Sequence, residues 1–261
     1  MSVKVSAASY WIGYKTILIK EVTRILRIWA QTLIPPVITM SLYFVIFGAI
    51  IGRRVGEMGG LPYMEFIVPG LIMLSVITNA YGNVTSSFFG AKFGRHVEEL
   101  LVSPLPPWII LAGYVSGAVF RAMAVGVLVW LIAAVFSGFQ MHNPLVSISI
   151  LLMTAIVFSL GGFINAIYAQ KFDDISIIPT FVLQPLTYLG GVFFSTSLLP
   201  GVWEKISLVN PIVYMVSAFR YGLLGISDIP LWIAYALILV FGAVLFSICL
   251  FLLTRGVGLR T

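Results

Sequence analysis

Long apolar runs alternate with short polar segments along the chain, and this pattern predicts a bundle of membrane-spanning helices. A helix needs about 20 apolar residues to cross the hydrocarbon core of a bilayer, and six runs reach or approach that length. They cover residues 33–51, 66–89, 108–136, 145–169, 175–193 and 231–253. The sequence therefore predicts an all-α integral membrane protein with six transmembrane helices in a single transmembrane domain, residues 1–261.

The N-terminal segment, residues 10–29, is too charged to span a bilayer and has an amphipathic pattern. Aromatic and aliphatic side chains fall on one helical stripe, and basic side chains fall on another. Such a helix lies along an anionic membrane surface with its cations in water, so residues 1–30 are predicted to form an interfacial helix. No signal peptide is expected, because Lys15 and Glu21 stand where its apolar core would lie.

The most polar interruption deep in the chain is the segment 91–107, which reads AKFGRHVEELLVSPLPP. Its apolar residues recur at helical spacing and predict a short amphipathic helix over residues 93–102, which the prolines that follow would end. The residues of interest on this helix are Phe93, Gly94, Val97, Glu98, Glu99, Leu100 and Leu101. Exposed to water between two spans, the helix could be a handle for another protein. A solvated loop with one turn of helix explains this stretch alone equally well.

The connection between the last two predicted spans, residues 194–230, is too apolar for a simple hydrophilic loop. Its two apolar pieces, residues 202–209 and 212–224, are each too short to cross the membrane, and Asn210 and Pro211 form the turn between them. Non-helical backbone at membrane depth is tolerated only against protein or a water-filled cavity. The connection is therefore predicted to be a re-entrant helical hairpin that packs on the bundle.

Composition and charge agree with membrane placement and indicate an orientation. Of the 261 residues, 60% are hydrophobic and only 9% are charged, whereas a soluble domain has roughly 25% charged residues. Ten of the 15 Lys and Arg residues fall on the side that holds both termini and residues 91–107, and four fall on the opposite side. Because cytoplasmic loops carry the excess of Lys and Arg, both termini and residues 91–107 are predicted to be cytoplasmic. The basic residues are too scattered to indicate a nucleic-acid partner.

Catalytic chemistry is not expected in this chain. The sequence contains no G-x-x-x-x-G-K-[ST] phosphate-binding loop, no H-E-x-x-H, no C-x-x-C and no G-x-S-x-G. His96 and His142 are predicted to lie on opposite sides of the membrane, and Cys249 is the single cysteine, which excludes a disulfide framework. We therefore predict no catalytic residue, no metal ligand and no cofactor in this chain.

One charged residue lies well inside a predicted span. Arg121 follows Pro107 by 14 positions, which corresponds to roughly 21 Å of helix, and Glu65 at the start of the second span is its expected partner. A structural role for Arg121 and Glu65 is favoured over a contact with substrate. An ion-driven carrier usually places several acids at mid-membrane, and the pattern predicts none there.

Polar and aromatic residues in the second and fifth spans are candidates for a transport pathway: Asn79, Asn83, Phe181, Gln184 and Tyr188. In the alternative interpretation, the polar side chains form hydrogen bonds between helices and the aromatic ones pack against neighbours. Gly190 and Gly191, near the outer end of the fifth span, would allow two backbones to approach closely or would let the span break.

Residues 172–225 resemble the signature region of ABC-2 type permeases, which are the membrane subunits of bacterial exporters driven by a separate ATP-binding subunit. The matching parts are the polar FDD entry, the P-x₅-P-x₄-G-G span, the outer LLP, and the arm that opens with NP and ends with FRYGLLG. The resemblance extends over the whole chain and is strongest in this region and in residues 78–104.

The resemblance implies a permease that works with a second copy of itself and with two ATPase subunits, which hold ATP and Mg. Residues 93–102 would be the coupling helix that enters a cleft of the ATPase, and residues 10–29 would be the connecting helix. Substrate, which could be a lipid, a glycan or a drug-like molecule, would move outward across the bacterial cytoplasmic membrane between the two permeases. Spans two and five would line the path, and spans one and five would meet at the dimer interface near Gly190 and Gly191. The alternatives are a membrane scaffold without transport and an ion-coupled carrier.

Overall fold

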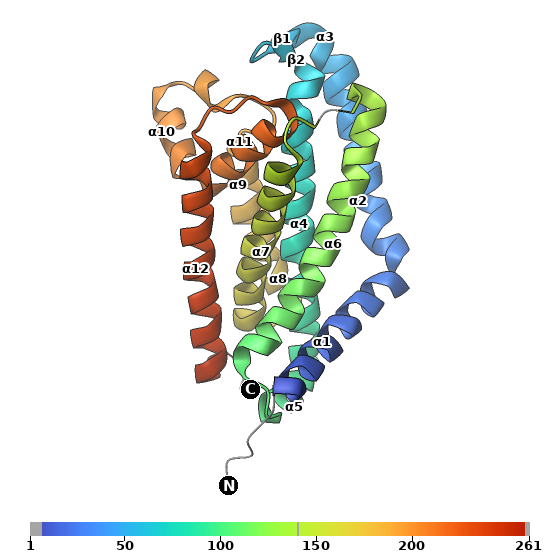
Figure 1. Ribbon diagram of the computed structural model, residues 1–261, viewed down its shortest axis with the longest axis vertical. Helices are drawn as coiled ribbons and strands as arrows, with labels where there is room; N and C mark the ends of the chain where they lie inside the picture. The colour runs from blue at the N-terminus through green and yellow to red at the C-terminus, as the bar shows by residue number, and fades with distance from the viewer. Residues whose placement is uncertain (1–6, 140, 259–261) are drawn as a thin grey trace.

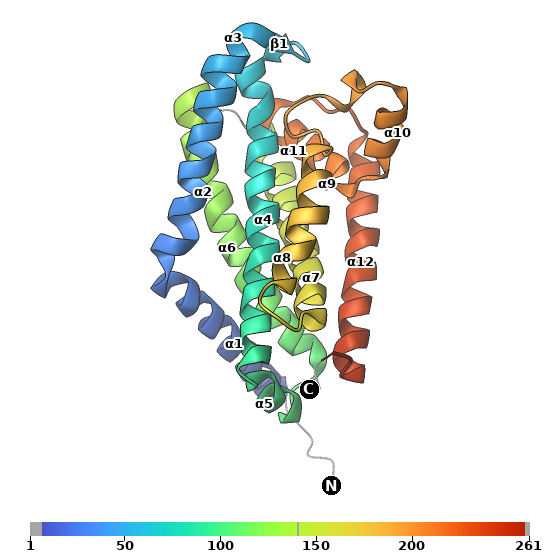
Figure 2. The same cartoon turned by 180° about the vertical axis from the view of Figure 1, so that it is seen from behind.

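The computed structural model describes residues 7–139 and 141–258, so residues 1–6 and 259–261 of the predicted terminal segments lie outside the described part of the chain. The described chain forms an elongated bundle of helices (Figures 1 and 2). Two strands of two residues each, β1 (Glu57–Met58) and β2 (Leu61–Pro62), pair antiparallel at one end of the bundle and are a small departure from the all-α prediction.

Five helical stretches in the described residues are long and apolar enough to cross a membrane. The first combines α2 (Trp29–Tyr43), the π-helical η1 (Phe44–Ile51) and α3 (Gly52–Val55); the others are α4 (Tyr63–Phe93), α6 (Pro107–Ser137), α7 (Pro144–Tyr168) and α12 (Leu231–Arg255). Each stretch contains one predicted run or covers it to within a residue. The apolar pattern therefore located five of its six runs as long helices.

The remaining run, predicted as a span over residues 175–193, is a shorter helix that is α-helical at both ends and π-helical in the middle. It consists of α8 (Asp174–Ile178), the π-helical η2 (Pro179–Leu183) and α9 (Gln184–Tyr188). A proline lies at the start of the second piece and another in the first turn of the third. Because proline lacks the N–H that a continuous α-helix uses and its ring crowds the preceding turn, the helix changes its hydrogen-bond pattern there.

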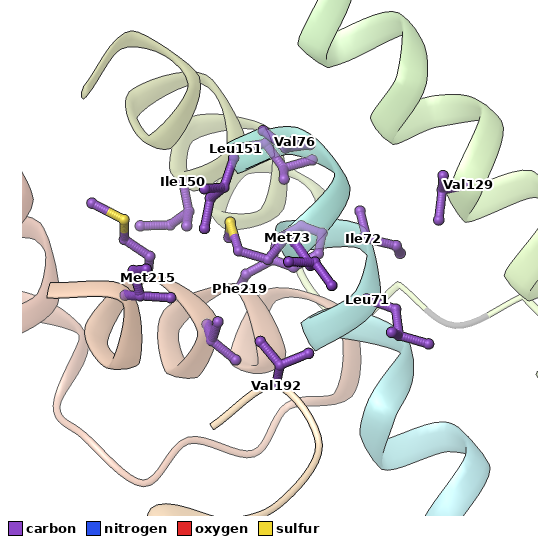
Figure 3. Packing of buried hydrophobic residues seen from close by; sticks show 14 of the residues in the cluster. Leu71, Ile72, Met73, Val76, Val129, Ile150, Leu151, Val192, Met215 and Phe219 are labelled. Carbon is purple, nitrogen blue, oxygen red and sulfur yellow. The ribbon is translucent and has the colours of Figure 1, made fainter. Parts of the chain in front are cut away.

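α4 is the central helix of the bundle, since most of its residues are buried. It packs along α6 and α7, and α11 (Pro211–Leu224) lies against it as well. Figure 3 shows the interlocking side chains of this core: Leu71, Ile72, Met73 and Val76 from α4, Val129 from α6, Ile150 and Leu151 from α7, Val192, and Met215 and Phe219 from α11. Lipid tails are as apolar as these side chains, so close packing rather than escape from lipid holds such helices together.

α1 (Ala7–Arg27) runs obliquely across one end of the bundle and joins α2 at an elbow (Figures 1 and 2). It packs on α6 at two glycines spaced one turn apart. A methyl group at Gly113 would lie 2.5 Å from Ile17 Cγ2, and one at Gly117 would lie 2.5 Å from Glu21 Cβ. The absent side chains of these glycines therefore allow α1 to approach α6 closely.

The two ends of the bundle differ in structure. α1, α5 (His96–Val102) and the last turns of α12 gather at one end, which we call the α5 end (Figure 1). The strands, η3 (Thr196–Leu198), α10 (Gly201–Val209) and α11 gather at the opposite end, the α10 end. α10 and α11 each begin one residue before the apolar pieces predicted for this connection and end with them.

Candidate functional site

The predicted helix over residues 93–102 begins three residues later than expected. α4 continues to Phe93, and a turn at Gly94 and Arg95 separates it from α5. Arg95 has a φ of 61°, in the left-handed region that costs a non-glycine residue roughly 1–2 kcal/mol, whereas Gly94 has an ordinary φ of −78°. The chain therefore turns sharply at Arg95 before α5 starts.

α5 uses part of its apolar face on its own bundle. Val97 is only 3% exposed and Leu100 is partly buried, and both pack in the hydrophobic cluster at the α5 end. The predicted apolar face is therefore not available as a whole to another protein. Phe93, which is 64% exposed, belongs to the end of α4 rather than to α5. The predicted residues of α5 itself that remain exposed are Glu98, Glu99 and Leu101.

Contacts with the α7–α8 connection brace the base of α5. Lys92 Nζ donates hydrogen bonds to the backbone oxygens of Ile167, at 2.6 Å, and Ala169, at 2.8 Å. These two oxygens lie at the C-terminal end of α7, where a cation is favoured by the helix dipole and by unpaired carbonyls. The ring centroid of Phe93 lies 4.9 Å from that of Phe172 in the same connection. These contacts hold the turn before α5 against the ends of two long helices, α4 and α7.

Asp174 fixes the shape of this connection. Its Oδ2 accepts hydrogen bonds from the backbone N–H groups of Gln170, at 2.8 Å, and Lys171, at 3.0 Å. These bonds stabilise the carboxylate and hold the pKa of Asp174 below its usual range. The side-chain amide of Asn165 donates to the backbone oxygen of Ile175 at 3.1 Å, so the start of α8 is held against α7.

A second candidate site is a pocket of about 340 Å³ between α2, α4, α6 and α9. Figure 2 shows α2 and the α8–η2–α9 helix on either side of α4. The residues that line the pocket are Gln31, Pro35, Pro36, Thr39, Met40, Tyr43, Leu74, Ser75, Thr78, Asn79, Arg121, Gln184, Thr187 and Tyr188. The pocket therefore combines polar groups from α4 and α9 with apolar and aromatic walls.

Three of the five predicted pathway residues meet in this pocket, namely Asn79, Gln184 and Tyr188. Asn83 lies one turn beyond Asn79 along α4 and is fully buried, and its Oδ1 accepts a hydrogen bond from Arg24. Phe181 is 74% exposed and does not line the pocket. The aromatic side chains that pack on Phe193 are Tyr43 and Phe47 from the α2–η1 stretch and Tyr188 from α9.

Arg121 lines the same pocket and lies away from its predicted partner. It shares the pocket with Ser75 and Asn79, and Glu65 precedes Ser75 by ten positions on α4, which corresponds to about 15 Å of helix. Within the described residues Arg121 makes no hydrogen bond or ion pair, and its Nε is buried without a hydrogen-bond partner. The predicted Arg121–Glu65 pair is therefore absent from the described structure.

A buried polar network that the sequence reasoning missed joins α1 to α4. Glu21 is fully buried and accepts hydrogen bonds from Ser87 Oγ, at 2.7 Å, and from Arg24 Nη2, at 2.9 Å. The same Arg24 nitrogen donates to Asn83 Oδ1 at 2.8 Å. Arg24 thus lies half-buried rather than on a fully solvated face. The signal for this network in the sequence was Glu21, which follows Ile17 by four residues. An acid therefore takes a position on the apolar stripe of this helix, where a core residue is expected.

The predicted structural residues near the α10 end are buried within the chain. A methyl group at Gly190 would lie 2.6 Å from Ile212 Cγ2 on α11, and Gly191 has a φ of 72°, which favours glycine. The Gly191 carbonyl accepts a hydrogen bond of 2.7 Å from Arg220 Nη2, a buried cation that the sequence reasoning did not single out. These glycines therefore contact α11 and not the outer surface of the chain.

Asn210 and Pro211 form the turn between α10 and α11, as predicted. Asn210 Oδ1 accepts a hydrogen bond from the Ile212 N–H at 3.0 Å and caps α11, with Pro211 as its first residue. Asn210 Nδ2 also donates to the Leu186 carbonyl at 2.6 Å. One buried amide therefore fixes both the turn and its position against α9.

Comparison with known proteins gives a consistent match. The family model described as ABC-2 type transporter matches residues 13–224. The chain is 57% identical to the inner membrane transport permease YadH of Escherichia coli strain K12, over 97% of this chain and 98% of that protein. It is 25% identical to nodulation protein J of Sinorhizobium fredii, over 70% of each chain, and 25% identical to nodulation protein J of Rhizobium leguminosarum bv. viciae, over 70% of this chain and 71% of that protein.

Proposed function

Because this chain belongs to the ABC-2 type transporter family, as a membrane permease, we propose that it is the membrane half of an ATP-driven exporter. The chain carries no catalytic ATPase domain, and ABC permeases pair with ATPase subunits that use ATP. In our proposal a separate ATPase hydrolyses ATP with Mg, and this chain moves a lipid, glycan or drug-like substrate outward across the cytoplasmic membrane.

The observation that carries this proposal is the geometry of α5. Its exposed side presents Glu98, Glu99 and Leu101, while Val97 anchors it to the bundle. The Lys92 bonds tie its base to the end of α7. A short helix that is held at its base and exposes acidic side chains fits a groove in a partner protein. A push on α5 would then reach α4 and α7, which form the walls and core of the bundle.

We place the α5 end in the cytoplasm, because the excess of Lys and Arg in the sequence lies on that side. In this orientation both termini are cytoplasmic, and α1 lies along the inner leaflet. Trp11, 64% exposed on α1, supports this placement because tryptophan favours the membrane interface. The single domain over residues 1–261 then comprises the interfacial helix, the bundle and the α5 segment.

We propose that residues 175–193, which include most of α8, all of η2 and α9 and the turn that follows, form the sixth span, and that α10–α11 is a re-entrant hairpin in the outer leaflet. α11 is apolar but has only 14 residues, too few to cross a bilayer. Its buried contacts with α4 and α7 satisfy the requirement that such a segment packs on protein. The ion pair of Arg220 with Asp228, at 3.5 Å, holds the end of α11 to the following turn.

We further propose that two copies of the chain meet through α2 and the α8–η2–α9 helix. Both present large apolar side chains to the surroundings, including Ile38 at 54%, Leu42 at 55% and Phe181 at 74% exposed. The polar pocket opens between these two elements. A second copy placed there would enclose the pocket and complete a path lined by α4 and α9.

An ion-coupled carrier and a scaffold without transport explain the structure less well. Among the buried residues described, Glu21 is the one carboxylate, and Arg24 neutralises it. A carrier needs acids free to exchange ions at mid-membrane. A scaffold gives no reason for a polar pocket within the bundle.

The test is retention of the ATPase subunit by the purified permease. Glu98→Lys with Glu99→Lys places like charges at the proposed contact, which costs several kcal/mol where the pairs are desolvated. We expect at least a tenfold loss of the co-purified ATPase, with membrane insertion unchanged. The matched control is Glu57→Lys with Glu204→Lys, two exposed acids at the α10 end. Equal retention in both double variants, with normal ATP-dependent export, would rule out coupling through these acids.

A further inference from the structure

We propose that the pocket between α2, α4, α6 and α9 binds an anionic amphiphile, with its anionic group on Arg121 and its apolar part along the pocket walls. The proposal rests on the proposed function only for the idea that such a molecule is cargo. Binding at Arg121 is a property of this chain and is measured without the ATPase.

Arg121 carries a charge that no group in the described chain compensates. It lies within α6, a helix apolar enough to span the membrane, and it makes no hydrogen bond or ion pair within the described residues. A charged group in this setting is normally paired. Glu21 cannot serve, because its carboxylate is held by Arg24 and Ser87. An anion supplied from outside the chain would complete the site.

Other residues of the same pocket carry polar groups that are unused within the described chain. Ser75 Oγ is buried and has no hydrogen-bond partner in the described chain, although its residue lines the pocket. Gln31 from α2 and Gln184 from α9 also line the pocket, and their side-chain amides make no hydrogen bond within the described residues. A hydroxyl, two amides and a guanidinium in one pocket supply several donors for one anionic group.

Part of the pocket lining is apolar. Pro35, Pro36 and Met40 from α2 face Leu74 from α4 and Tyr188 from α9. Beyond them, toward the α10 end, Phe193 packs on Phe47 with a centroid distance of 4.8 Å. A small hydrophilic anion would leave these walls unused. A ligand with an acyl or aryl portion would cover them, and the volume of about 340 Å³ holds a head group and the first part of a tail.

Thermal unfolding of the full chain in a neutral maltoside detergent tests binding. The probes are dodecyl phosphate, dodecyltrimethylammonium and inorganic phosphate, the two amphiphiles being added at equal mole fraction in the micelle. A ligand that binds the folded state raises the unfolding temperature. We expect dodecyl phosphate to raise it, the cationic amphiphile not to raise it, and inorganic phosphate to act at least tenfold more weakly. Inorganic phosphate as effective as dodecyl phosphate would overturn the amphiphile assignment.

Variants of Arg121 assign the effect to this pocket. Arg121→Gln should weaken the apparent affinity for dodecyl phosphate at least tenfold, and Arg121→Lys should retain part of it because the charge remains. Ser75→Ala should weaken it less. Arg53→Gln, which removes an exposed cation at the α10 end, is the matched control and should bind like the wild type. Equal stabilisation of Arg121→Gln and wild type, or an equal response to the cationic amphiphile, would overturn the proposal. Should Arg121→Gln fail to fold, the lysine and serine variants decide.

Reconstitution with the ATPase subunit separates cargo from a resident lipid. ATP-dependent outward movement of dodecyl phosphate identifies the ligand as cargo, and binding without movement identifies an anionic membrane lipid; both outcomes support the site. Loss of the ATPase partnership with intact dodecyl phosphate binding would refute the proposed function and leave this site in place.

Discussion

At the scale of single residues, the structure assigns the charged positions near the elbow to contacts that hydropathy cannot reveal. The amphipathic pattern of α1 was visible in the sequence, but Arg24 was placed with the solvated cations. In the structure Arg24 links Glu21 of its own helix to Asn83 of α4. A stripe pattern reports which face is apolar on average, whereas a single acid on that face is explained only by the groups that α4 brings to meet it.

The first prediction concerns Glu21, whose removal would leave Arg24 without its carboxylate partner and Ser87 without its acceptor. Breaking a buried pair by removing one partner costs about 3–5 kcal/mol, and Arg24 keeps partial access to solvent with 24% of its side chain exposed. We therefore expect Glu21→Ala to lower the free energy of unfolding by about 3 kcal/mol. The thermal unfolding midpoint of the purified chain in detergent measures the change.

Glu57→Ala is the control, because Glu57 is exposed on the strand pair at the α10 end. Its midpoint should stay close to the wild-type value, since exposed substitutions remain within about 0.5 kcal/mol. A Glu21→Ala midpoint equal to that of the control would mean that the network carries no stability.

At the scale of elements, apolar length and proline position predicted different parts of the fold. The five long helices follow from uninterrupted apolar runs, and the turn at Asn210 and Pro211 follows from a capping residue before a proline. The π-helical segment that begins at Pro179 was not predicted, because the run stays apolar across Pro179 and Pro185, whereas the end of the helix at Tyr188 agrees with the break expected at Gly190 and Gly191. Whether a proline bends a helix or ends it depends on what packs beside it.

The orientation of α5 was also beyond the pattern. Its apolar residues were expected to face a partner, yet Val97 is buried in its own bundle. A helical stripe indicates that one face is covered, and it does not say whether the cover is the same chain or another. The pairing of Arg121 with Glu65 failed for a related reason: counting residues along one helix does not show how that helix is offset against its neighbour, and Arg121 shares a pocket with Ser75, about 15 Å of helix from Glu65.

The second prediction concerns the close packing of α1 on α6. A side chain at Gly117 would meet Glu21 Cβ at 2.5 Å, so Gly117→Val should push α1 away and break its bonds to α4. We expect the free energy of unfolding to fall by about 2–3 kcal/mol, at the upper end of the usual cost of overpacking. We also expect faster proteolysis of the N-terminal segment.

Gly82→Ala on α4 is the matched control, because a methyl group there meets nothing within 4 Å. Since alanine favours a helix over glycine by about 1 kcal/mol, this variant should be as stable as the wild type or more so. If Gly117→Val and Gly82→Ala unfold alike, the close approach of α1 is not what holds it.

At the scale of the whole molecule, the bundle has a braced helix at one end and a polar pocket within it. α4 connects them, since α5 follows it directly and Ser75 and Asn79 of α4 line the pocket. The sequence indicated both parts. α5 lies in the polar segment that interrupts the apolar runs, and three of the five residues predicted for the pathway line the pocket. The sequence could not indicate the contribution of α2, because Gln31 and Tyr43 join the pocket only through the fold.

Contact between α5 and the ATPase subunit can be measured by site-specific photo-cross-linking. A benzophenone side chain would replace Leu101, which is 36% exposed on α5, or Val202, which is 71% exposed on α10. Each variant is co-expressed with the P-loop ATPase subunit and irradiated in native membranes. We predict an adduct between the permease and the ATPase from position 101 and none from position 202. An adduct from position 202 alone, or no adduct from position 101 in a complex that still hydrolyses ATP, would contradict the account.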